Sequence, residues 1–170
     1  MIDLDKLAAE IHAAAVEKGF WDVEDADSKH IAKMISELGE IVQADRAGVM
    51  YEIEREGAKP EGVIAEIADF VMMALDLMMR FGLSLPECDI DEWCKDGKID
   101  GITGMNAYNL VCATTATLTS LYKSETIEPY LAMILCAYVW SRHRGYDLWE
   151  IISQKMEYNK SRPALHGRLY

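Results

Sequence analysis

The segment from Pro60 to Phe81 constrains the fold most, because it is apolar on nearly every face of a helix. At about 100° per residue, apolar side chains occupy two opposite sides: Ile64, Ile67, Val71, Ala74, Leu75 and Met78 on one, and Phe70, Met73 and Leu77 on the other. Such a helix is buried on nearly all faces. It also contains Glu66 and Asp69, and buried carboxylates need partners because an unpaired buried charge is costly. The segment therefore predicts a central helix with partnered acids.

Helical periodicity recurs along the rest of the chain and predicts helices over about 3–18, 29–46, 104–123, 127–144 and 146–160. Residues 82–103 carry the turn signals of a loop, whereas Gly48 to Gly57 fits either a loop or an extension of the preceding helix. No segment shows the alternation of a strand. The predicted fold class is all-α, with a single helical-bundle domain over residues 1–170.

The predicted helix ends depend on a few residues with special backbone chemistry. Asp27 or Ser28 is expected to cap the start of the second helix. Pro60 is expected in the first turn of the third helix, and Gly82 is expected to close it.

Residues 104–145 carry a weak internal echo of the chain before them. One helix ends in Arg80-Phe-Gly-Leu-Ser-Leu and a later one in Arg144-Gly-Tyr-Asp-Leu, and each follows another helix. This pattern predicts an additional, degenerate helical hairpin that lacks the acids of the first. Coincidence among helices of similar length explains the echo equally well.

The composition excludes several classes of protein. The chain has 29 acidic and 17 basic side chains, a formal net charge of −12, and such a surface repels nucleic-acid backbones. Its four cysteines lack the spacing of a zinc site, which predicts reduced thiols. The N-terminus does not have the pattern of a signal peptide, and the longest apolar stretch is too short for a bilayer. We therefore expect a cytoplasmic protein with no membrane and no nucleic acid as partner.

Candidate metal ligands occur as two acidic pairs, Glu37-x-x-Glu40 and Glu66-x-x-Asp69. A spacing of three places both carboxylates of a pair on neighbouring positions of one helix face, where they can share a cation. Hard oxygen ligands favour Mg²⁺, or Mn²⁺ in its place. No Glu-x-x-His pair of a di-iron bundle is present. On a helical wheel Glu40 lies nearly opposite the apolar stripe of its helix, so its role requires that face to meet a cleft or a partner subunit.

These pairs resemble the MazG-like all-α nucleoside triphosphate pyrophosphatase superfamily, which includes the dimeric dUTPases. The resemblance rests on four segments in order: GFWD, ISELGEIVQADR, EGVIAEIADFVMMALDL and KMEYNKSRPALHG. Here about sixty residues separate the third segment from the fourth, whereas in shorter relatives the tail follows almost directly. The resemblance implies a four-helix-bundle core of MazG type with an additional helical hairpin. It also implies Mg²⁺-dependent cleavage of a (d)NTP into the monophosphate and pyrophosphate.

The resemblance also implies roles for individual residues. The expected metal ligands are Glu37, Glu40, Glu66 and Asp69, and Glu37 doubles as the base that accepts a proton from water. The residues expected to bind the nucleotide substrate are Trp21, Lys155, Asn159 and Arg162. Trp21 either stacks on the base or caps the core.

Two questions stay open at the level of the sequence. The first is whether the chain is an enzyme or a non-catalytic helical protein of the same fold that binds a nucleotide or a partner. The second is assembly: we expect a homodimer or a higher homo-oligomer, unless the second hairpin takes the place of a partner subunit and one chain closes its own bundle.

Overall fold

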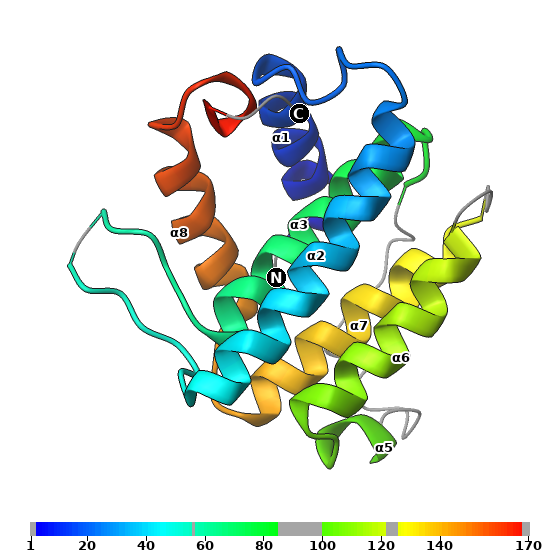
Figure 1. The fold of residues 1–170 in the computed structure, drawn as a ribbon. Coiled ribbons are helices and arrows are strands. Elements are labelled where there is room, and N and C mark those ends of the chain that lie inside the picture. Colours follow the sequence, from blue (N-terminus) through cyan, green and yellow to red (C-terminus); the bar gives the residue numbers. More distant parts are fainter. Residues whose placement is uncertain (1–2, 56, 85–99, 122–125, 168–170) are drawn as a thin grey trace.

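The computed structural model of the protein describes residues 3–55, 57–84, 100–121 and 126–167. These residues form seven α-helices and a short 3-10 turn, η1 (Ala164–Gly167), and within them the only strand-like pairing is an isolated bridge between Glu52 and Glu61. The all-α class is confirmed (Figure 1). The helices are α1 (Leu4–Glu17), α2 (Ala26–Ala47), α3 (Val63–Arg80), α5 (Asp100–Thr103), α6 (Ala107–Leu121), α7 (Glu128–His143) and α8 (Leu148–Lys160).

Helix α3 is the centre of the fold, as its apolar faces predict. Thirteen of its 18 residues are buried, and α1, α2, α7 and α8 all pack against it. Two of the buried residues are the acids Glu66 and Asp76. Although α3 is strongly apolar, none of the helices among the described residues combines the length and apolar character needed to cross a lipid bilayer.

Helices α6 and α7 form a second layer beside this centre (Figure 1). They pack against each other, α6 also packs on α2, and α7 also packs on α3. The aromatic side chains Tyr130 and Trp140 of α7 are buried in the same core as α3. The segment predicted as a second hairpin is therefore two paired helices that cover α2 and α3.

The start of α2 differs from the prediction. The helix begins at Ala26, one turn earlier than expected, and its N-cap is Asp25 rather than Asp27 or Ser28. Asp25 has a left-handed backbone (φ 54°) and makes no side-chain capping bond. Ala26 is buried, so tertiary packing draws this residue into the helix where local capping chemistry favours a later start.

The start of α3 also differs, because Pro60 lies before the helix and not in its first turn. The loop after α2 folds back, so that the amides of Val63 and Ile64 donate to the carbonyls of Val49 and Met50, both at 3.0 Å. These bonds satisfy donors that a helix start leaves without partners. Gly62 makes the close approach possible: its φ is +100°, and a Cβ there would lie 2.9 Å from the Met50 carbonyl. Residues 48–55 and 57–62 are thus a loop and not a helical extension.

The other predicted feature of α3 is confirmed at its end. The helix stops at Arg80, and Gly82 follows with φ +67°. Among the cysteines, Cys112 and Cys136 are free thiols, whereas Cys88 and Cys94 lie outside the described residues.

Candidate metal centre

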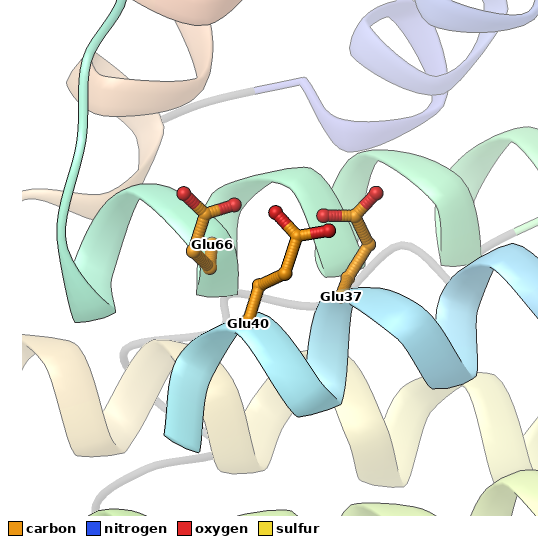
Figure 2. A group of neighbouring side chains, drawn as sticks. All are labelled: Glu37, Glu40 and Glu66. Atoms are coloured by element: carbon orange, nitrogen blue, oxygen red, sulfur yellow. The ribbon is translucent and has the colours of Figure 1, made fainter. Parts of the chain in front are cut away.

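Three of the four predicted ligands come together where α2 and α3 lie side by side. One carboxylate oxygen from each of Glu37, Glu40 and Glu66 lies within 4.8 Å of the others. Figure 2 shows the three carboxylate groups on the same side of the two helices. Glu40 thus reaches the cluster although a helical wheel places it away from the apolar stripe. A Glu side chain is long enough to bring its carboxylate beside that of Glu37, three residues earlier on the same helix.

The cluster lies largely out of contact with solvent. Glu37 is 8% exposed and Glu66 is 6% exposed, whereas Glu40 is half-buried. Burial is the largest cause that raises the pKa of Glu37 to about 7, and the charges of Asp69 and Glu40 contribute in the same direction. Burial also raises the pKa of Glu66, although the ammonium of Lys155 partly counteracts this. Close like charges with little water around them therefore favour a bound cation or bound protons.

Asp69, the fourth predicted ligand, lies beside the three glutamates and is paired with Lys155. Its Oδ2 accepts a hydrogen bond from Lys155 Nζ at 2.5 Å. Lys155 Nζ also lies 4.0 Å from Glu66 Oε2, and the Lys155 side chain is almost fully buried. This lysine comes from α8, which packs on α3. The tail residue predicted to contact phosphate thus supplies a buried positive charge to the acids.

One carboxylate oxygen in the centre lacks a hydrogen-bond donor. Glu66 Oε2 is buried and makes no hydrogen bond, because Lys155 at 4.0 Å is too distant to donate one. A buried acceptor left in this state is costly. Three carboxylates and a fourth acid nearby, without sulfur or imidazole, form the donor set that a hard divalent cation prefers. The residues therefore fit Mg²⁺ or Mn²⁺.

The other two tail residues lie at the end of α8. Asn159 is in its last turn, and Arg162 follows the helix end at Lys160, as Pro163 predicts. The Arg162 guanidinium lies 3.4 Å from Asn159 Oδ1. Both residues are half-buried.

A second buried acid, Asp76, forms a polar network that sequence analysis missed. Its Oδ1 lies 2.6 Å from His12 Nδ1 and accepts a hydrogen bond from Trp21 Nε1 at 3.1 Å, while its Oδ2 lies 3.7 Å from His30 Nδ1. His30 Nε2 in turn lies 2.9 Å from the Met73 carbonyl. Burial lowers the pKa of His30 and raises that of Asp76. The available signal was the presence of Asp76 within the longest apolar stretch of the chain.

The Trp21 ring has an aromatic and a cationic neighbour beside this network. The His30 ring stacks on it with a centroid separation of 4.8 Å, and the Arg80 guanidinium lies 5.2 Å from its centre. Trp21 also packs against the hydrophobic core. These contacts favour the alternative in which Trp21 caps the core over the one in which it stacks on a base.

Comparison of the chain with protein-family models, curated proteins and solved structures gives no match.

Proposed function

We propose that the protein is a nucleoside triphosphate pyrophosphohydrolase that uses Mg²⁺, with Mn²⁺ as a substitute. The observation that carries the proposal is the group formed by Glu37, Glu40 and Glu66, whose carboxylate oxygens lie within 4.8 Å of one another. The buried oxygen of Glu66 without a hydrogen bond supports a cation at that place. The order of the acidic and tail motifs, which resembles the MazG-like superfamily, supports the reaction.

Some of the chain's residues would bind the metal, and others would bind the nucleotide. Glu37, Glu40, Glu66 and Asp69 would hold Mg²⁺, which when bound neutralises phosphate charge and lowers the pKa of coordinated water. Glu37, whose carboxylate lies in the group that would hold the metal, would also accept a proton from the attacking water. Asn159 and Arg162 would contact the phosphates or the sugar, whereas Lys155, buried against Asp69, would contribute positive charge to the centre.

The packing of α6 and α7 bears on the predicted bundle and on assembly. We infer that α2, α3, α6 and α7 form the four-helix core within one chain, because α6 and α7 pack on each other and on α2 and α3. This arrangement favours the alternative in which the second hairpin takes the place of a partner subunit's helices. Sedimentation equilibrium tests it: a monomer is expected, and a stable dimer would favour the original expectation of a homo-oligomer.

The proposed activity is tested with a panel of canonical and damaged (d)NTPs and a pyrophosphate readout. We expect Mg²⁺-dependent release of pyrophosphate from at least one nucleotide. Glu40→Ala and Asp69→Ala should each lower kcat/KM by about 10³-fold or more, equivalent to roughly 4 kcal/mol of transition-state stabilisation.

Glu61→Ala is the matched control, because Glu61 is exposed and lies five residues before Glu66. It should leave turnover unchanged. Binding of Mg²⁺ and nucleotide without any pyrophosphate release would contradict the enzyme and support the non-catalytic alternative. Near-normal Mg²⁺-dependent activity in both Glu40→Ala and Asp69→Ala would contradict the assignment of the metal centre.

A further inference from the structure

Lys18 joins the C-terminal ends of α1 and α8. It is the C-cap residue of α1, and its backbone carbonyl accepts a hydrogen bond from the amide of Leu165 at 2.8 Å. Its ammonium donates to the Lys160 carbonyl at 3.2 Å and also to the Arg162 carbonyl. Figure 1 shows the chain beyond α8 crossing towards the end of α1. One residue thus connects the two helices through its main chain and its side chain.

The positive charge of Lys18 is favourable at the C-terminal ends of α1 and α8. The last carbonyls of a helix lack partners within the helix, and together they give its C-terminus a partial negative charge. Two such ends brought together repel each other. The Lys18 ammonium lies at the end of α8 and belongs to the end of α1, so it offsets the repulsion and supplies donors to two carbonyls.

This connection matters for the acidic centre because α1 and α8 reach α3 at different acids. Helix α1 contacts Asp76 through His12, whereas α8 contacts Asp69 through Lys155. The anchor beyond α8 therefore controls where the end of α8 lies relative to the glutamates. It holds the carbonyl of Arg162, while the guanidinium of that residue is directed towards Asn159.

We propose that Lys18 is a positioning residue for the C-terminal segment 160–165, which it holds so that Asn159 and Arg162 face the triphosphate of a nucleotide bound at the acidic centre. The proposal rests on the proposed function. Lys18 itself does not touch the substrate. Loss of the anchor should therefore weaken nucleotide binding and leave the chemical step nearly unchanged.

The test uses Lys18→Met, Lys18→Arg and the control Lys6→Met, which removes an exposed lysine from the same helix. Hydrogen exchange of the Leu165 amide reports the anchor without nucleotide, and steady-state pyrophosphate release reports KM and kcat. In Lys18→Met we expect exchange about tenfold faster and KM about tenfold higher, with kcat within about twofold of wild type. Lys18→Arg, which can donate to the same carbonyls, should restore both values, and Lys6→Met should match wild type.

The other possible outcomes distinguish failure of the anchor from failure of its positioning role. Unchanged exchange of Leu165 in Lys18→Met overturns the anchor. Faster exchange with an unchanged KM overturns its positioning role, and so does a tenfold fall of kcat at constant KM. If the wild-type protein releases no pyrophosphate from any nucleotide, the proposed function fails separately. The exchange measurement then still decides whether Lys18 anchors the segment.

Discussion

Two buried acids on α3, Glu66 and Asp76, lie in very different surroundings. Asp76 is surrounded by protein donors, since His12, Trp21 and His30 all approach its carboxylate. Glu66 lies among other acids, with the ammonium of Lys155 at 4.0 Å and one oxygen without any hydrogen bond. The same helix thus carries one acid that protein side chains contact at hydrogen-bond distance and one that has ammonium groups only at 4.0 Å, those of Lys59 and Lys155. The hydrogen-bond partners of these two acids therefore distinguish a structural network from a candidate site more clearly than burial does.

Asp76→Ala gives the largest effect on stability expected from this comparison. The change removes the carboxylate that His12 and the indole of Trp21 contact at hydrogen-bond distance, so we expect the free energy of unfolding to fall by about 4 kcal/mol. Urea unfolding measures it. Glu40→Ala is the contrasting variant, and its metal-free form should be as stable as wild type or more stable, because like-charge repulsion is relieved. Equal losses in the two variants would break the distinction between the two regions.

Lys155→Met tests whether the acidic centre depends on its one buried ammonium. Without metal, Asp69 loses its paired ammonium and Glu66 keeps only the partly exposed Lys59 at 4.0 Å, so we expect a loss of about 3 kcal/mol. Added Mg²⁺ should recover part of this loss, which urea unfolding with and without chelator would measure. Lys160→Met is the control, because Lys160 lies on the same helix and is exposed. A loss that Mg²⁺ does not reduce would argue against a cation in this centre.

The pKa of Glu37 predicts a pH dependence of the metal-free protein. Its pKa is about 7 in the folded state, against an ordinary value of 4.5. Between these values the folded state holds a proton that the unfolded state has released, so stability should fall as pH rises through this window. The loss attributable to Glu37 is at most about 3 kcal/mol.

Glu37→Gln isolates this contribution, because an amide resembles the protonated acid and does not titrate. With chelator present, the unfolding free energy should differ more between pH 5 and pH 8 in wild type than in this variant. Mg²⁺ should stabilise wild type more at pH 8, since it competes with the proton for the carboxylate. Parallel pH profiles for wild type and variant would show that the Glu37 proton does not contribute.

Trp21→Phe gives the smallest expected effect and sharpens the boundary of the Asp76 network. The variant keeps an aromatic ring but loses the hydrogen bond to Asp76, so we expect a loss of about 1 kcal/mol in unfolding free energy. The KM for nucleotide should not change if Trp21 caps the core. A clear rise of KM with little change in stability would instead support stacking on the base.

The helices and the acid pairs could be predicted from the sequence because they follow from local periodicity. The apolar faces of Pro60 to Phe81 predicted the buried central helix, and Gly82 predicted where it closes. The starts of α2 and α3 could not be predicted in this way. Burial of Ala26 and the backbone bonds that α3 donates to the carbonyls of Val49 and Met50 are long-range or loop effects that local capping preferences do not contain.

What the sequence determined by itself is which residues lie on each helix and which faces are apolar, because those depend on neighbours within a few positions. Tertiary structure alone decided that the pair Glu37 and Glu40 meets Glu66, that Lys155 is buried against Asp69, and that His12 and His30 both lie beside Asp76. Each of these contacts joins different helices, and the outcome depends on how those helices pack. No spacing within one helix encodes the distance between side chains on two of them, so charge pairing across helices became visible only in the folded chain.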